Sequence, residues 1–274
     1  MTQARAVIVG VSGRMGRALV RVASELPAVR ITAAVARAGS ASVGRDAGVL
    51  AGIEPLGVEV TSDLPAALAV ADVAIDFSQP HATRANIAAC RAAHTPLLIG
   101  TTGFAAELTE SELDAAAGDI PLLLAPNTSL GVALLIELVR RAARSLPPEF
   151  DVEIIEAHHR TKQDSPSGTA LALARAAGEG RGLEAQQALS GACAGGNGPR
   201  RQGEIGFAVV RGGDIVGEHT VLFAGSGEEL RLSHRAGDRA LFARGALRAA
   251  RWLAGQPAGR YGMGDIVHED QYLG

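Results

Sequence analysis

The chain has 274 residues, of which 47% are hydrophobic and 3% aromatic, and its formal net charge is −3. This length supplies one large domain or two ordinary ones with real hydrophobic cores. The slightly acidic balance gives no basic field for nucleic acid or an anionic membrane, so any local basic group should serve a small anion.

Neither a membrane span nor a leader is expected from the sequence. No apolar run approaches the roughly 18 residues that a membrane span needs, and MTQAR passes straight into AVIVG without the three regions of a signal peptide. These observations predict a cytoplasmic protein. The two cysteines, Cys90 and Cys193, have no motif spacing and are expected to be free thiols in a reducing compartment.

Predicted strands and helices alternate over the first 125 residues or so. The segment RAVIVGVSGRMGRALVRVASEL reads as a buried strand, a glycine turn and an amphipathic helix, which together begin a βαβ unit. Four more strands are predicted, each after a helical stretch: VRITAAVAR, ADVAIDFS, TPLLIGTTG and IPLLLAPN. The alternation predicts an α/β fold of the Rossmann type, a doubly wound parallel sheet whose ligands lie beyond the carboxyl ends of its strands.

A different pattern follows NTSLGV. The amphipathic helix GVALLIELVRRAARSL ends at Pro147-Pro148, and FDVEIIEAHH then alternates like a strand. The helix SGTALALARAAGE leads into SGACAGGNGPRRQGE, which reads as a glycine-rich mobile loop. Three consecutive strands follow, for which antiparallel pairing is favoured: IGFAVVRGG, GEHTVLFAG and EELRLSHRA. A helix, DRALFARGALRAARWLAG, and a short tail, YGMGDIV, come last.

These patterns divide the chain into two predicted domains. A nucleotide-type domain extends to about Asn127, and a second α+β domain with a mainly antiparallel open sheet extends to about Gly237. The patterns alone allow the last helix to belong to either domain.

The glycine turn GVSGRMG lies between the first strand and its helix. Gly10 would permit the tight turn, Gly13 would let a pyrophosphate approach the helix N-terminus, and Gly16 would let the helix pack closely on the strand. Ser12 occupies the middle glycine position of the dinucleotide motif G-x-G-x-x-G. A purely structural strand-to-helix turn therefore remains an alternative.

Two arginines near this turn bear on the choice of cofactor. A dinucleotide site often has an acidic residue about 20 positions after the turn, but Ala36-Arg37 stands there. With no carboxylate to repel a 2′-phosphate, and with Arg14 and Arg37 available, the sequence predicts a preference for NADPH over NADH; Arg37 as a solvated loop charge is the alternative. The segments at 99–103 and 125–129 also end strands where a doubly wound sheet presents loops to its ligand.

The segment EAHHRTKQDSPSGTA contains two adjacent histidines close to cationic residues and a helix start. If the strand continued through His158 and His159, their rings would point to opposite faces and could not share one role, although a bend would relax this. The other histidines have no such neighbours and are expected to be ordinary core or surface groups: His81, His94, His219, His234 and His268.

A metal site is one alternative for the paired histidines. No cysteine or third histidine stands at ligand spacing, and Arg160 and Lys162 would repel a cation, so no metal is predicted. A small dianion fits better, because residues 166–169 begin a helix with unpaired N–H groups, and His159 and Lys162 would serve a second carboxylate. The remaining alternative is that Ser167 or Thr169 only caps the helix.

Six segments, in matching order and spacing, resemble the 4-hydroxy-tetrahydrodipicolinate reductase (dihydrodipicolinate reductase) family: VIVGVSGRMGR, IDFS, IGTTGF, EIIEAHHRTKQDSPSGTA, IGFAVVRGGDIVGEHTV and FARGALRAARWL. The resemblance implies NAD(P)H-dependent reduction of 4-hydroxy-tetrahydrodipicolinate to tetrahydrodipicolinate, in the diaminopimelate route to lysine. Hydride would add to a cyclic imine dicarboxylate after loss of its hydroxyl as water. The alternatives are another two-domain oxidoreductase acting on an amino-acid-like anion and a non-catalytic NAD(P)-binding sensor.

The resemblance also implies roles for individual residues. His158 would be the general acid/base and Lys162 a second proton donor, while His159, Gly168 and Thr169 would hold the substrate carboxylates. The implied cofactor contacts are Gly10, Val11, Ser12, Gly13, Arg14, Met15, Arg37, Gly100, Thr101, Thr102, Ala125, Pro126, Asn127 and Thr128. The cofactor would be NADPH by preference, with NADH possible.

The family is typically a homotetramer that associates through the sheet of the second domain, and its C-terminal helix returns to the first. The resemblance thus implies a dinucleotide-binding domain over 1–128 and 238–274, and a substrate-binding and oligomerisation domain over 129–237. Two departures are Ser12, in place of a glycine, and Ala36, in place of the acidic residue of dual-specificity members. No residue is transferred from the glycine-rich loop at 190–204, which resembles the family only thinly.

Overall fold

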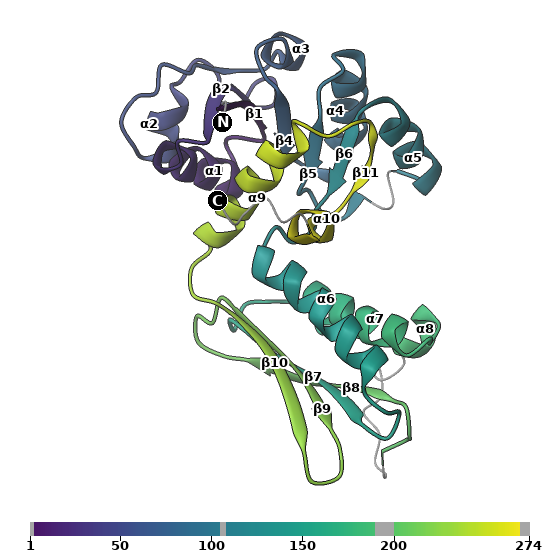
Figure 1. Cartoon of the computed structure of the whole chain (residues 1–274). Helices are drawn as coiled ribbons and strands as arrows, with labels where there is room; N and C mark the ends of the chain where they lie inside the picture. Colours follow the sequence, from purple (N-terminus) through teal and green to yellow (C-terminus); the bar gives the residue numbers. More distant parts are fainter. Residues whose placement is uncertain (1–2, 105–107, 190–199, 269–274) are drawn as a thin grey trace. The chain divides into compact units, whose positions relative to one another are not determined.

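The computed structural model describes residues 3–104, 108–189 and 200–268. The chain divides into two compact units, one extending to Ser129 and resuming at Ala240, the other formed by Leu130–Arg239 (Figure 1). Each unit has its own cluster of buried hydrophobic residues. Among the described residues, no helix is both long and apolar enough to cross a bilayer.

The first unit contains a seven-stranded sheet in the order β11-β6-β5-β4-β1-β2-β3, and every neighbouring pair is parallel. The strands are β1 (Ala4–Val9), β2 (Val29–Val35), β3 (Val60–Thr61), β4 (Val73–Asp76), β5 (Leu97–Ile99), β6 (Pro121–Leu124) and β11 (Gly259–Tyr261). The order reverses between β1 and β4, which is where such a sheet forms its ligand crevice. The predicted doubly wound parallel sheet is therefore confirmed.

Seven helices of the described residues belong to this unit: α1 (Arg14–Glu25), α2 (Ala47–Ala51), α3 (Leu64–Leu68), α4 (Pro80–Ala92), α5 (Glu110–Asp119), α9 (Ala240–Leu253) and α10 (Met263–His268). Helix α9 packs against α1, β4 and β5, and a Cβ on Gly245 would lie 1.8 Å from the carbonyl oxygen of Thr128. Only a glycine lets α9 approach this closely, so the last long helix completes the first unit.

The segment predicted as a short tail is structured. Residues Gly259–Tyr261 form β11, which pairs in parallel with β6, and α10 follows. A three-residue strand has too few positions for an apolar periodicity, because its stability comes from the neighbouring strand. The expectation of a simple tail was therefore wrong.

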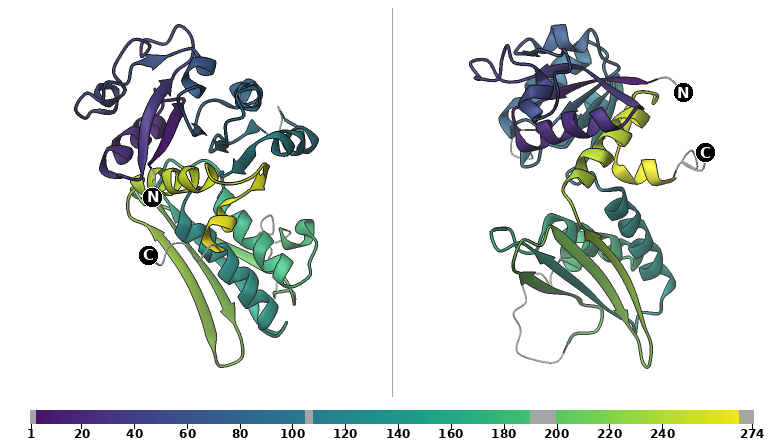
Figure 2. Two further views of the ribbon diagram at one scale, coloured as in Figure 1. Left: turned by 45° about the horizontal axis from the view of Figure 1, so that its top comes forward. Right: turned by 90° about the vertical axis from the view of Figure 1, so that its left-hand side faces the viewer.

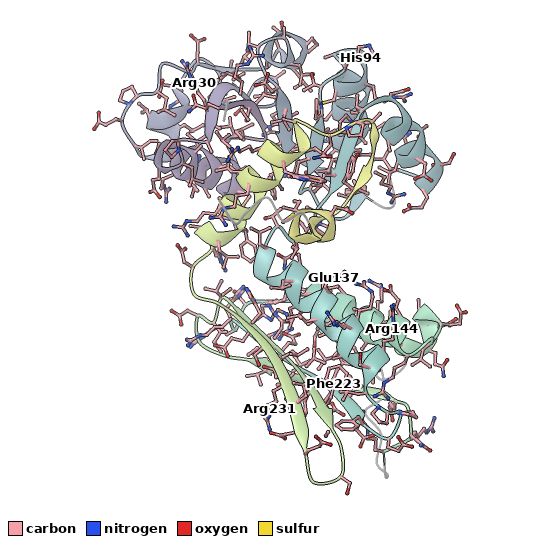
Figure 3. All side chains as sticks on the ribbon, in the orientation of Figure 1. Arg30, His94, Glu137, Arg144, Phe223 and Arg231 are labelled. Carbon is pink, nitrogen blue, oxygen red and sulfur yellow. The ribbon has the colours of Figure 1, made fainter. Side chains whose placement is uncertain are left out.

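The second unit is a four-stranded sheet in the order β10-β9-β7-β8, with helices packed against one face (Figure 2). Its strands are β7 (Asp151–His158), β8 (Ile205–Arg211), β9 (Gly217–Ala224) and β10 (Glu229–Ala236), and its helices are α6 (Leu130–Ser145), α7 (Gly168–Gly180) and α8 (Ala185–Ala188). Phe223, labelled in Figure 3, is fully buried between the sheet and these helices. The predicted α+β unit with a mainly antiparallel sheet is confirmed.

One strand pairing differs from the sequence-based expectation. Strands β9 and β10 are antiparallel, as predicted, but β8 pairs in parallel with β7 instead of antiparallel with β9. The chain reaches β8 through α7 and α8, and a strand that follows a helical crossover lies parallel to the strand before it. The run of three strand-like segments concealed this crossover.

The two cysteines can be placed only in part. Cys90 is a buried free cysteine, and burial raises the pKa of its thiol to about 12. Such a thiol stays protonated and unreactive at neutral pH. Cys193 lies outside the described residues, as does most of the glycine-rich loop predicted at 190–204.

Candidate functional site

The predicted cofactor loops of the first unit meet at one edge of its sheet. The ladder registers join the last residues of five strands in a single row: Val35, Val9, Asp76, Ile99 and Leu124. The chain leaves this row toward the predicted cofactor positions Gly10, Arg37, Gly100 and Ala125. Parallel strands thus bring together four loops that are far apart in the sequence.

The glycine turn has the conformation that its sequence predicts. Gly10 has φ +85°, and a Cβ there would lie 2.5 Å from the carbonyl oxygen of Phe77. A Cβ on Gly16 would lie 2.4 Å from the carbonyl oxygen of Gly10, so the helix packs directly on the turn. Gly13 is exposed and is the N-cap of α1, and no side chain caps that helix. The turn therefore offers an uncapped helix N-terminus of the kind that binds pyrophosphate.

Asp76 supports these loops and was given no role by the sequence analysis. Its side chain is fully buried and accepts hydrogen bonds from the Ser78 N–H at 2.8 Å, Asn86 Nδ2 at 3.0 Å and Thr101 Oγ1 at 3.3 Å. Its carbonyl oxygen accepts from the N–H of Gly100 at 2.9 Å. Asp76 thereby ties two loops to the end of β4, and an acidic residue closing a buried strand was the signal for it.

The implied cofactor residues differ in what their side chains can offer. Arg14, Arg37 and Thr102 are exposed, and Ala36 is buried. The Thr128 side chain is buried and donates to the carbonyl oxygen of Phe242 at 2.7 Å, so a cofactor contact through its hydroxyl would have to displace that bond. The exposed guanidinium groups and the uncapped helix N-terminus fit a phosphate-bearing dinucleotide.

In the second unit, a polar cluster replaces the apolar core at the carboxyl end of β7. Val152 and Ile154 face the helices, and the next two residues on the same face are Glu156 and His158. Glu156 pairs across the sheet with His219 of β9. All three polar residues are buried, with exposed fractions of 1% for Glu156, 8% for His158 and 4% for His219.

Glu156 is the centre of this cluster. Its Oε1 accepts a hydrogen bond from the Ser167 N–H at 2.9 Å, and both terminal nitrogens of Arg211 lie 2.9 Å from its carboxylate oxygens. Its Oε2 is also hydrogen-bonded to Nδ1 of His158. Burial opposes the charged form, but the bonds from Arg211, Ser167 and His158 outweigh it and lower the pKa of Glu156. The carboxylate is therefore ionised at neutral pH.

The two buried histidines are in edge-to-face contact, with ring centroids 5.0 Å apart. Burial lowers the pKa of His219 to about 4, helped by the charge of His158. Burial also lowers the pKa of His158, although Glu156 opposes this shift. His219 was expected to be an ordinary histidine; it is buried and hydrogen-bonded to Ser167 Oγ at 3.0 Å, and it lies beside the predicted catalytic residue.

The turn after β7 carries the next two predicted site residues. Strand β7 ends at His158, so His159 leaves the strand and is half-buried, with Nδ1 2.8 Å from Thr161 Oγ1. Lys162 forms an ion pair with Asp164 at 2.8 Å. The end of the strand removes the constraint that would have pointed the two imidazoles to opposite faces.

The N-terminus of α7 combines both alternatives considered from the sequence. Ser167 is the N-cap, and its Oγ accepts from the Ala170 N–H at 3.2 Å. Gly168, the first helical residue, is exposed, and no atom lies within 4 Å of the place where its Cβ would be. The capped helix thus still leaves open space beside its first turn, where an anion could approach backbone N–H groups.

Glu156, His158 and His219 are the one group among the described residues with three metal-ligand atoms close together, all within 4.8 Å. The guanidinium of Arg211 already occupies the position of a cation, because it binds Glu156 through two nitrogens. A second cation beside it would be repelled. The expectation that the site holds no metal stays a prediction.

Comparison with known proteins places the chain in a family. The family model for the N-terminus of dihydrodipicolinate reductase matches residues 4–128, and the model for its C-terminus matches residues 131–267. The chain belongs to the dihydrodipicolinate reductase family. A relative named 4-hydroxy-tetrahydrodipicolinate reductase, from Alkalilimnicola ehrlichii, is 52% identical over 263 residues, covering 96% of this chain and 98% of its own.

A second reductase of that name, from Anaeromyxobacter dehalogenans, is 48% identical over 263 residues and covers 96% of this chain and 97% of its own. The solved structure of a dipicolinate-bound dihydrodipicolinate reductase from Paenisporosarcina sp. TG-14 superposes with a TM-score of 0.76 at 24% identity, covering 97% of this chain and all of that one. The dihydrodipicolinate reductase fold is thus shared over almost the whole chain.

Proposed function

We propose that the protein catalyses the NAD(P)H-dependent reduction of 4-hydroxy-tetrahydrodipicolinate to tetrahydrodipicolinate in the diaminopimelate route to lysine. The observation that carries the proposal is the match of both reductase family models, over 4–128 and 131–267, to a chain with a buried histidine cluster beside an open helix N-terminus. The nicotinamide cofactor, when bound, supplies the hydride.

Substrate carboxylates are assigned to the open N-terminus of α7 and to the turn before it. The N–H groups of Gly168 and Thr169 would bind one carboxylate, and His159 would bind the other. Lys162 is 21% exposed and paired with Asp164, whose own side chain is 58% exposed. An exposed ion pair is weak, so a dicarboxylate can compete with Asp164 for the ammonium group.

Proton delivery is assigned to His158, with Lys162 as the second donor. Imidazole exchanges a proton near neutral pH, and a positioned general acid contributes about 10²–10⁴-fold to a rate. The ammonium of Lys162 would stabilise negative charge that develops on the substrate. His158 is the last residue of β7, and Lys162 belongs to the turn between β7 and α7, so one short segment supplies the proton and the carboxylate contacts.

A preference for NADPH is part of the proposal. Arg14 and Arg37 are exposed at the edge where the predicted cofactor loops meet, and Ala36 supplies no carboxylate to repel a 2′-phosphate. The remaining cofactor contacts are proposed as the family resemblance implies them.

We also propose a homotetramer formed through the face of the second unit's sheet that lies opposite the described helices α6, α7 and α8. That face carries Ile155, paired with Ala208 of β8, and Ala157, paired with Val210, which is 49% exposed. Exposed apolar groups on a sheet face favour association. Light scattering on the wild type and on Val210→Glu would test this, with a smaller assembly expected for the variant. A cytoplasmic location remains a prediction from the sequence.

The activity is tested by following the oxidation of NADPH, and in parallel of NADH, by the purified protein. The substrate is made freshly from pyruvate and aspartate semialdehyde by the synthase that comes before the reductase in the diaminopimelate route. Rapid oxidation that is lost in His158→Ala and Lys162→Ala would support the reaction and both roles. A folded protein that binds nucleotide but oxidises neither cofactor would instead be a sensor.

A further inference from the structure

Glu156 has no role in the proposed reaction, yet its carboxylate is buried and hydrogen-bonded on both oxygens. Its side chain has no solvent exposure, and a buried carboxylate is costly unless it is paired and hydrogen-bonded. Four donors meet it: two nitrogens of Arg211, the Ser167 N–H and Nδ1 of His158.

These contacts determine which nitrogen of His158 carries the proton. Arg211 and the Ser167 N–H are obligate donors, so they hold Glu156 in its ionised form. An ionised carboxylate can only accept, and Nδ1 of His158 must therefore donate to it. The nitrogen left to exchange a proton is Nε2, which lies beside Gly217: a Cβ at that position would be 3.1 Å away.

We infer that Glu156 is a positioning residue, which fixes the ring of His158 so that Nε2 is the proton-exchanging atom. This inference rests on the proposed function, because it assumes that His158 transfers the proton. Arg211 and Ser167 orient the carboxylate, as a third group orients the base in other acid/base pairs.

The same carboxylate links the proton donor to the anion site. Ser167 donates its N–H to Glu156 and caps α7 with its hydroxyl, immediately before Gly168. Glu156 therefore bonds, on its two oxygens, the ring of His158 and the start of the helix that would hold a substrate carboxylate. A single buried group sets the distance between donor and substrate, on which rates depend steeply.

Charge around His158 makes the loss of Glu156 measurable. Burial, Lys162 and Arg211 all lower the pKa of His158, and Glu156 is the group that opposes them. The neighbouring His219 adds no negative charge. Without the carboxylate, the protonated form of His158 should therefore appear only at lower pH.

The test variant is Glu156→Gln. Because the Ser167 N–H and one nitrogen of Arg211 donate to Oε1, the amide oxygen should take that position, and the second Arg211 bond, to Oε2, would be lost. The NH₂ group would then face Nδ1 and force the proton of neutral His158 onto Nε2. We expect kcat at pH 7 to fall about 100-fold. The alkaline limb of the pH–rate profile, where His158 loses the proton that it delivers, should move to lower pH, while KM for the dicarboxylate and Kd for NADPH stay close to the wild-type values.

A measurement that does not depend on activity accompanies the kinetics. Nitrogen-15 NMR of histidine-labelled protein should show the Nδ1–H tautomer of His158 in the wild type and the Nε2–H tautomer in the variant. Glu179→Gln is the matched control, because Glu179 also binds an arginine of this unit, Arg140, but is 56% exposed on α7. This control should leave kcat, the pH profile and the tautomer unchanged.

Glu156→Asp provides a test should the glutamine variant not fold. It keeps the charge but shortens the side chain by one methylene, so an intermediate kcat with an unmoved pH profile is expected. Wild-type kcat in Glu156→Asp would overturn the inference, as would a glutamine variant that keeps the Nδ1–H tautomer and the wild-type profile. A raised KM with unchanged kcat would overturn it too, because Glu156 would then serve substrate binding.

Failure of the wild type to oxidise NADPH would refute the proposed function, whereas the NMR result would still report on the His158 proton.

Discussion

Gly217 of β9 faces the imidazole of His158 at the end of β7, and a Cβ at position 217 would lie 3.1 Å from Nε2 and 3.3 Å from Cδ2 of that ring. The φ angle of Gly217 lies outside the left-handed region that favours glycine, so the reason for a glycine here is the space that the ring occupies. Gly217 is thus part of the polar cluster that contains His158 and His219.

Gly217→Ala is expected to lower kcat about tenfold, because the added methyl group must push the ring of His158 by a few tenths of an ångström. Steady-state kinetics with NADPH would measure the effect. Gly212→Ala is the control, because nothing lies within 4 Å of its Cβ position, and its N–H bond to the carbonyl oxygen of His158 is kept. Equal activity of both variants would contradict the assigned contact.

Stability should fall as the solution becomes more acidic, in part through His219. Its ordinary pKa is 6.5 and burial lowers it to about 4, so between these values the unfolded chain binds a proton that the folded chain does not. The free energy of unfolding should therefore decrease by about 2 kcal/mol between pH 7 and pH 5 from this group. The charged and titratable groups that act on His219 are His158, Glu156, His234 and Lys162.

The variant His219→Gln, which keeps an amide near Ser167, isolates this contribution. Urea unfolding at pH 7 and pH 5 should show a smaller loss of stability in the variant than in the wild type. An identical loss in both proteins would mean that His219 is not held neutral by the fold.

Gly100 lies against the ring of Phe77 at the edge where the cofactor loops meet. A Cβ at position 100 would be 2.1 Å from the ring, so Gly100→Ala is expected to cost about 1–3 kcal/mol of stability through overpacking and to weaken NADPH binding. Thermal unfolding and fluorescence titration would measure both. Gly118→Ala in α5 is the control; no atom lies near its Cβ position, and a helical alanine should add about 0.5–1 kcal/mol.

Arg37→Ala should raise KM for NADPH about tenfold and leave KM for NADH nearly unchanged, because a guanidinium–phosphate bond is worth about 1.5–3 kcal/mol. Arg30→Ala is the matched control, since this exposed arginine belongs to β2, the same strand that leads to Arg37 (Figure 3). A parallel change in KM for both cofactors would show that Arg37 does not recognise the 2′-phosphate.

The sequence predicted the elements whose signals are local. Strands β1, β2, β4, β5 and β6 are short runs rich in buried apolar residues, and α6 has a long apolar stripe. Two short elements, β3 and β11, have too few residues for periodicity and depend on a neighbouring strand. The direction of β8 follows from the helical crossover through α7 and α8, whereas the prediction considered only the three neighbouring strand-like segments.

In the candidate site, too, residues close together in the sequence were predicted, and a contact between distant residues was not. His158, Lys162 and the start of α7 lie within one stretch, so their chemistry was visible in the order of residues. Glu156 was visible too, but its role requires Arg211, which is 55 residues away and reaches it through the parallel pairing of β7 with β8. Because β8 was predicted to be antiparallel to β9, the sequence did not predict the ion pair between Arg211 and Glu156.

The boundaries of the two units have a consequence for synthesis of the chain. Residues 130–239 are continuous in sequence, whereas the first unit needs α9, β11 and α10, which begin only at Ala240. The chain is synthesised from its N-terminus, so the whole second unit leaves the ribosome before the C-terminal part of the first unit. At that stage β6 has not yet paired with β11, and the Thr128 hydroxyl has not yet bonded to the carbonyl oxygen of Phe242. The inserted unit can therefore finish folding first, and the nucleotide-type unit, whose sequence flanks it on both sides, is completed last.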